Sequence, residues 1–405
     1  MADRIFAALA AAMPHTAQPY PYLPVMRRIV YSPAYRLSRA TFSRHRNGAG
    51  RVGPSVSAQT QRAFLYHWQH PILRGIRRLP AALARQVRGW RLRLLNRIRD
   101  RLPKPMRQVV DWLREQKKPK LWRLIHHPPR RLAPPRLPLR PYPATEPLSI
   151  SIVTPSLNQG RFIGRTIESI LDQGYRRLEY VVQDGGSCDE TPRVLAAYSG
   201  RLTQVFGPDA GQADAVNRAF RLTSGEIMAY INADDMLAAG ALHYVARYFS
   251  QHPDVDAIYG HRITIDKNDR EVGRWILPPH SDDALLWADF VPQETLFWRR
   301  SLWRRVGEFD VTFQFALDWD FLLRCVAAKA RIVRLPRFIS FFRVHERQKT
   351  TTLLSTVGKE EMERLHRRYL GRVPSPVEIS RRLRRYYLLH QVCHHAYRAG
   401  ILRYN

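Results

Sequence analysis

Between residues 148 and 232, short apolar runs alternate with segments of helical periodicity, and this alternation limits the fold more than any other feature of the sequence. The runs predict strands at Leu148–Thr154, Leu178–Asp184, Thr203–Phe206 and Glu226–Asn232, and the periodic segments predict helices at Arg161–Asp172, Glu190–Tyr198 and Gln212–Leu222. This order predicts an α/β fold with a mostly parallel sheet flanked by helices on both faces. Ligands of such folds bind at the carboxyl ends of the strands.

The positive charge of the chain is concentrated before this region. Residues 1–145 hold 30 Lys and Arg residues against four acidic ones, so they carry +26 of the formal net charge of +32. Such a basic arm attracts phosphate, either on nucleic acid or on an anionic bilayer. Residues 82–102 and 106–125 also place apolar side chains at helical spacing between arginines, which is typical of helices that lie in a membrane interface. Packing of these stripes against the rest of the chain is an equal alternative, and nucleic acid is disfavoured because no recognition motif is present.

Composition suggests four segments. Residues 1–127 form the basic N-terminal region with its amphipathic helices, and the proline-rich residues 128–147 are a predicted linker. The α/β domain runs over residues 148–352, and residues 353–405 form a basic helical tail that either packs on this domain or extends the cationic surface. Three widely spaced cysteines and the lack of a long apolar run near the start favour a cytoplasmic protein, peripheral on the cytoplasmic face of the membrane.

The first chemically suggestive site follows the second predicted strand. Asp184 ends that strand and is followed by Gly185 and Gly186. A carboxylate there can accept hydrogen bonds from a nucleotide base or a sugar, while the glycines let the backbone approach closely. An Asp-Gly turn that merely reverses the chain is the alternative.

The second site follows the strand that ends near Ile231. Asn232, Asp234 and Asp235 lie there. Adjacent carboxylates repel each other unless a cation lies between them, and oxygen ligands suit Mg²⁺ or Mn²⁺. A helix N-cap would explain only one of the two aspartates.

The third site is FALDWDFLLRC, in which Asp318 and Asp320 open an amphipathic helix. Without further context, capping of that helix is the favoured interpretation of both carboxylates. The cluster His390, Cys393, His394 and His395 has helical spacing, but a partner cluster that would complete a metal site is missing from the sequence.

Taken together, the blocks SIVTPSLNQGRFIGRTIESILDQGY, LEYVVQDGGSCDET, GQADAVNRAFRLTSGEIMAYINADDML and QETLFWRRSLWRRVGEFD with ALDWDFLLR resemble the family 2 glycosyltransferases, which have a GT-A fold. The resemblance runs from Leu148 to about Thr352. It implies that the chain moves a sugar from a nucleotide-sugar donor, a UDP-sugar first of all, to a glycan or lipid-linked acceptor. It also implies a role in surface glycan or polysaccharide biosynthesis. A sugar-nucleotide pyrophosphorylase and a scaffold or nucleic-acid-binding protein on an inactive core are the alternatives.

The resemblance also assigns residues. The expected nucleotide-sugar contacts are Thr154, Pro155, Ser156, Leu157, Asn158, Asp184, Gly185, Gly211, Asp214, Asn217, Asn232 and Asp234. The family usually has an aromatic residue where Leu157 stands, and Asn232 replaces the first aspartate of its DxD motif. The expected metal ligands for Mn²⁺ or Mg²⁺ are Asp235, helped by Asp234, and His345. Asp318 falls where the family keeps its catalytic base, with Leu317 in place of the usual glutamate.

Overall fold

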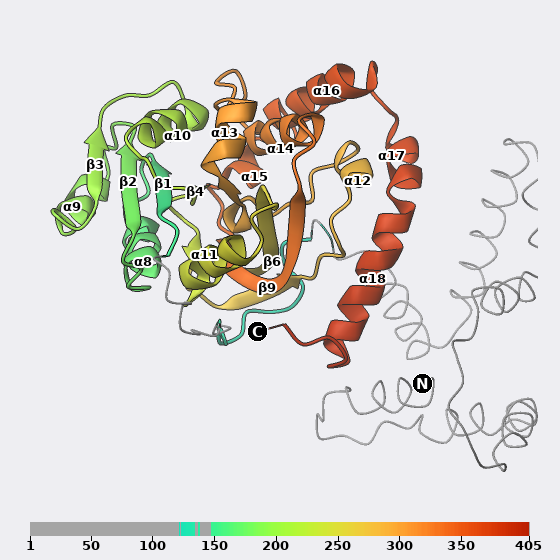
Figure 1. The fold of residues 1–405 in the computed structure, drawn as a ribbon, viewed down its shortest axis with the longest axis horizontal. Helices are drawn as coiled ribbons and strands as arrows, with labels where there is room; N and C mark the ends of the chain where they lie inside the picture. The colour runs from blue at the N-terminus through green and yellow to red at the C-terminus, as the bar shows by residue number, and fades with distance from the viewer. Residues whose placement is uncertain (1–120, 122, 134–136, 138–146, 405) are drawn as a thin grey trace, which may run out of the picture. The chain divides into compact units, whose positions relative to one another are not determined.

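The computed structural model describes residues 121, 123–133, 137 and 147–404 (Figure 1). Within them a single sheet has the strand order β3-β2-β1-β4-β8-β6-β9-β5, and β7 pairs with β6. Most of the basic N-terminal region, including the two predicted amphipathic helices up to residue 120, lies outside the described residues. Among the described helices none is long and apolar enough to cross a membrane.

The first half of the sheet is parallel, as the sequence predicts. Its elements are β1 (Ile150–Ser156), α8 (Gly160–Leu171), β2 (Leu178–Asp184), α9 (Thr191–Ala196), β3 (Thr203–Phe206), α10 (Gln212–Arg221) and β4 (Ile227–Tyr230). The strand β1 pairs in parallel with both β2 and β4, and β2 pairs with β3. The carboxyl ends of these strands therefore meet at one edge of the sheet.

Alternation of side chains along β1 explains why helices cover both faces. Ile150 and Ile152 belong to the apolar core that includes Ile163 and Ile167 of α8. Val153 points to the opposite face, into the core that includes residues of α10. Because successive side chains of a strand alternate, a run that is buried throughout needs apolar cover on each face.

The second half of the sheet mixes parallel and antiparallel pairs. Its elements are β5 (Met236–Leu237), α11 (Ala241–Gln251), β6 (Ala257–Ile265), β7 (Glu271–Trp275), α12 (Asp282–Leu285), η1 (Gln293–Thr295), β8 (Phe297–Arg299), α13 (Arg300–Val306), α14 (Leu317–Ala327) and β9 (Ile332–Arg343). The strand β8 joins the halves by antiparallel pairing with β4 and β6. Residues 126–130, which span the predicted start of the linker at residue 128, bond along β7, where the backbone of Arg130 pairs with Glu271.

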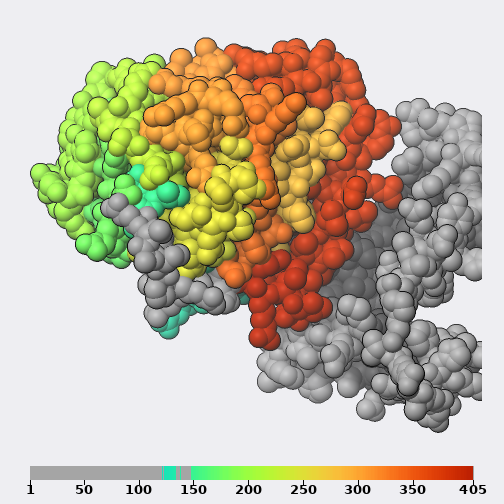
Figure 2. Space-filling model, viewed as in Figure 1, coloured from blue at the N-terminus to red at the C-terminus, as the bar shows by residue number. Residues whose placement is uncertain are grey.

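The C-terminal segment packs back on the α/β body. It contains α15 (Lys349–Thr352), α16 (Val357–Leu370), α17 (Pro376–Arg382) and α18 (Arg384–Arg398). Leu365, Leu383 and Tyr386 are buried in the same core as α14, and the Tyr386 ring lies 4.3 Å from that of Phe290. In the space-filling view the red C-terminal residues continue the surface of the orange and yellow ones (Figure 2). Of the two arrangements open from the sequence, the tail adopts the packed one.

Candidate active site

A cavity of 1290 Å³ lies at the carboxyl ends of β1 and β4 and extends to the C-terminal helices. The sequence-predicted residues that line it are Pro155, Ser156, Leu157, Gly211, Asn232, Asp234, Asp235 and Asp318. The topology thus brings candidate residues from three separate sequence blocks to one cavity: metal ligands, nucleotide-sugar contacts and the general base. This is expected for strands whose carboxyl ends share an edge.

Thr154 and Asp184 are not among the residues that line the cavity. Thr154 lies within β1, where its hydroxyl meets that of Tyr180 at 3.1 Å inside the sheet. The Asp184 carboxylate is buried and accepts hydrogen bonds from the backbone N–H and the hydroxyl of Ser187. In this structure Asp184 fixes its own turn, and its contact with a nucleotide base stays a prediction.

The turn after Asp184 supports the cavity indirectly. Gly185 donates to the carbonyl of Ser156, and Asn158 accepts from the backbone N–H of Cys188, so the two strand-end loops are bound together. A Cβ on Gly185 would lie 2.6 Å from Oδ2 of Asp209. Asp209 lines the cavity and was missed by the sequence analysis. The glycine permits the close approach of this carboxylate, and its expected contact with the nucleotide sugar stays a prediction.

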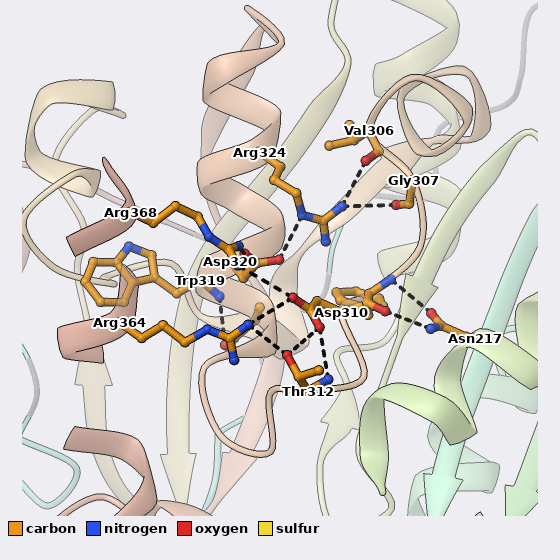
Figure 3. A network of polar contacts seen from close by, with 12 residues as sticks. Asn217, Val306, Gly307, Asp310, Thr312, Trp319, Asp320, Arg324, Arg364 and Arg368 are labelled. Carbon is orange, nitrogen blue, oxygen red and sulfur yellow. Dashed lines mark hydrogen bonds and ion pairs between the residues drawn. The ribbon is translucent and has the colours of Figure 1, made fainter. Parts of the chain in front are cut away.

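Of the three residues of the block 211–217 that the resemblance assigns to the nucleotide sugar, only Gly211 lines the cavity. Gly211 lines the cavity with a φ of 114°, which favours glycine. Asp214 instead accepts from the N–H of Ala210 and pairs with Arg218. Asn217 is buried, and its amide group exchanges two hydrogen bonds with the backbone of Phe309 (Figure 3). Asp214 and Asn217 therefore fix loops in this structure and do not reach the cavity.

Asp235 is held inside the protein. The residue is 1% exposed, its Oδ1 accepts from the backbone N–H of Arg343, and its Oδ2 accepts from the amide of Asn232. Burial, followed by the charges of Asp234 and Glu294, raises the pKa of the Asp235 carboxyl well above its usual range. Both oxygens of Asp235 thus have protein partners in this structure, and its role as the leading metal ligand stays a prediction.

Asp234 has the better position for a cation. Its carboxylate lines the cavity, and Oδ2 lies 2.9 Å from Nε2 of His345. The described residues contain no group of three or more Asp, Glu, His or Cys side chains that could hold a metal by themselves. Mg²⁺ and related ions commonly take only one or two protein ligands and complete their shell with substrate phosphates and water. Asp234 with His345 fits that mode of binding.

Asp318 and Asp289 are two further carboxyl groups that line the cavity. Asp318 stands at the start of α14, where it accepts from the backbone N–H of Trp319, and burial raises its pKa to about 6. Burial and then the charge of Asp318 raise the pKa of Asp289 well above its usual range. With a pKa of about 6, Asp318 is mostly ionised at neutral pH and is able to accept a proton.

Several cavity residues gave no signal in the sequence analysis. Glu294 of η1 forms a two-pronged ion pair with Arg262 of β6, and both residues are buried. Gln212 donates to the side chain of Asn232 and accepts from Nζ of Lys349. These two contacts join residues that are 20 and 137 positions apart, so no local sequence pattern predicts them.

The cavity, lined by carboxylates at the strand ends of an α/β fold, lies where folds of this class bind their ligands. The model of the family described as glycosyl transferase family 2 matches residues 151–314. A PGL/p-HBAD biosynthesis glycosyltransferase of Mycobacterium bovis (strain BCG / Pasteur 1173P2) is 31% identical over 189 residues, which cover 45% of this chain and 72% of that protein. An uncharacterized glycosyltransferase of Nostoc sp. (strain PCC 7120) is 26% identical, with 53% of this chain and 70% of that protein covered.

The chain belongs to glycosyl transferase family 2 and is a nucleotide-sugar-dependent glycosyltransferase. The α/β class and GT-A type of fold expected from the sequence are thereby confirmed. Among solved structures, the chain is similar to S. aureus TarS 1-349 in complex with UDP-GlcNAc, at 18% identity and a TM-score of 0.47, with 60% of this chain and 72% of that one covered. It is also similar to the mannosyltransferase PcManGT of Pyrobaculum calidifontis in complex with GDP-Man and Mn²⁺, at 18% identity and a TM-score of 0.45, with 73% and 81% covered.

Proposed function

We propose that this glycosyltransferase moves its sugar with inversion of the anomeric carbon, assisted by Mn²⁺ or Mg²⁺, with Asp318 as the general base. The observation that carries the proposal is the ionised Asp318 carboxylate in the same cavity as Asp234. A base whose pKa lies near the working pH is efficient in proton transfer.

The reaction follows from these positions. Asp318 accepts the proton of the acceptor hydroxyl while that oxygen forms a bond to the anomeric carbon of the donor. The bond from this carbon to the diphosphate oxygen breaks, and its electron pair leaves with the nucleoside diphosphate. Attack from the face opposite the leaving group inverts the configuration. Asp234, next to His345, would hold the divalent ion, which as a Lewis acid stabilises the charge that develops on the diphosphate.

A donor screen tests this proposal. The full-length chain with Mn²⁺ should release nucleoside diphosphate from one member of a panel of UDP- and GDP-sugars, and EDTA should lower that rate by about 100-fold or more, because the leaving group loses its charge stabilisation. Asp234→Asn should reproduce much of this loss, whereas Asp214→Asn, outside the cavity, should not. Full turnover in EDTA would remove the metal from the mechanism.

We propose further that the acceptor belongs to a surface glycan or polysaccharide pathway and that the basic residues 1–127 hold the enzyme at the anionic cytoplasmic face of the membrane. The net charge of +26 over residues 1–145 supports this placement. The full-length protein should sediment with vesicles that contain phosphatidylserine and should be released by raising the salt concentration to 1 M. Equal sedimentation with neutral phosphatidylcholine vesicles would count against it.

A further inference from the structure

The cavity has two halves that differ in chemistry. The half at the strand ends holds polar residues such as Ser156, Asn232 and Asp234. The apolar lining residues Trp287, Leu354, Met362, Val373, Ile379 and Tyr387 are called here the apolar half, and Lys359, Glu363 and His366 line the cavity as well. Five of these six residues follow Thr352 in the chain, so the C-terminal segment contributes most of the apolar half.

The side chains of the apolar half keep part of their surface accessible. Leu354 is 44% exposed and Val373 is 41% exposed, and the other four are partly exposed. Single exposed apolar residues are common on protein surfaces, but their convergence on one cavity is typical of a ligand site. Covering this surface with an apolar ligand would release its hydration water and favour binding.

The wall that carries these side chains is fixed to the catalytic body. Asp320 of α14 is fully buried and accepts hydrogen bonds from Arg324 of its own helix and from Arg368 of α16 (Figure 3). At the other end of α16, the Glu361 carboxylate accepts from the backbone N–H groups of residues 314–316, directly before α14. These contacts hold α16, which carries Met362, against the helix that begins with Asp318. Trp287, Ile379 and Tyr387 also pack against the core that contains residues of α14.

The position of Asp318 decides what the apolar half can receive. Asp318 lines the same cavity, and the polar half on the strand side contains the residues suited to a nucleotide and a cation. In-line attack with inversion requires the acceptor to approach from the side opposite the leaving diphosphate. An acceptor whose hydroxyl lies at Asp318 therefore extends its body away from the donor, into the apolar half.

We propose that the acceptor is an amphiphile, with its hydroxyl-bearing head at Asp318 and an apolar, ring-bearing or alkyl body in the apolar half. The indole of Trp287 and the phenol ring of Tyr387 suit an aromatic ring in this body. This inference rests on the proposed function and names the acceptor class for it. A free, wholly polar saccharide would leave the apolar surface uncovered.

Binding of 4-alkylphenols to the full-length chain tests the acceptor class. Measured by titration calorimetry with ethyl, butyl and hexyl chains, the Kd should fall by about fourfold for each added methylene that becomes buried. Ile379→Asn should raise the Kd of 4-hexylphenol by about tenfold or more. The matched control is Val377→Asn on the same helix, because Val377 is 79% exposed and lies outside the cavity; its Kd should equal that of the wild type.

Met362→Gln in α16 provides a second variant, in which glutamine keeps the approximate length of the methionine side chain. It should also raise the Kd of 4-hexylphenol. Nucleoside diphosphate release from the donor, measured in the same samples, reports separately on the proposed function. Absence of phenol binding, a Kd independent of chain length, or an equal loss in Val377→Asn would overturn the amphiphile proposal while donor turnover persists. Absence of donor turnover with intact, Ile379-dependent phenol binding would instead overturn the proposed function.

Discussion

Asp318→Asn is expected to lower kcat for sugar transfer by two to four orders of magnitude, the range in which a general base typically contributes. Asparagine keeps the size of the side chain and can still accept from the backbone N–H of Trp319, so the start of α14 should remain intact. It cannot take up the proton of the acceptor hydroxyl. Initial rates with donor and acceptor measure the loss, and the Kd for the donor should change by less than about threefold.

The matched control is Asp289→Asn. Asp289 is a second carboxyl that lines the same cavity, and its amide keeps the size of the side chain, so most of kcat should remain because Asp318 is the proposed base. The wild-type pH profile provides an independent readout of the same assignment. A base acts only when deprotonated, so kcat/KM should rise with pH through an apparent pKa of about 6. An aspartate with an ordinary pKa would keep its activity down to about pH 4. Wild-type activity that stays flat down to pH 4.5, or a fully active Asp318→Asn enzyme, would remove Asp318 from this role.

The sheet and the general location of the site could be predicted from sequence because both depend on local patterns. The strands Leu178–Asp184 and Thr203–Phe206 have the predicted bounds, since their apolar runs are short and end in polar residues. The site follows from topology once the strands are known, because parallel strands bring their carboxyl ends together. The role of Asp318 was harder to predict, because capping of α14 is the favoured interpretation from local sequence and only its place in the family pattern favours a catalytic role.

The roles of individual polar residues depend on partners far away in the chain. Asn217 bonds to Phe309, 92 residues later, and Asp235 accepts from Arg343, 108 residues later. A carboxylate or amide that the fold satisfies internally has the same local sequence as one that faces a substrate. The missed pair of Arg262 and Glu294 has the same origin, because its two residues lie on a strand and a 3₁₀ turn that are 32 positions apart in the chain.

Glu294→Ala is expected to destabilise the protein by about 3–5 kcal/mol, because it leaves the buried Arg262 guanidinium without its carboxylate partner. Arg262 is 7% exposed, and its guanidinium lies 4.7 Å and 4.1 Å from the ring centres of Trp275 and Phe342, where water cannot readily replace the lost partner. Urea denaturation of the full-length protein measures the change as a lower midpoint with an unchanged slope.

The control for this prediction is Glu308→Ala, which removes a two-pronged ion pair with Arg221 on the surface. Exposed pairs contribute about 0–1 kcal/mol, so the two variants separate burial from mere pairing. The double variant Arg262→Met, Glu294→Met should recover much of the lost stability, since it removes both charges. The Glu294 charge also helps to raise the pKa of Asp318. In folded Glu294→Ala, the rise of kcat/KM with pH should therefore occur at lower pH than in the wild type. A loss below about 1 kcal/mol together with an unchanged pH dependence would show that this pair neither supports the cavity nor tunes its base.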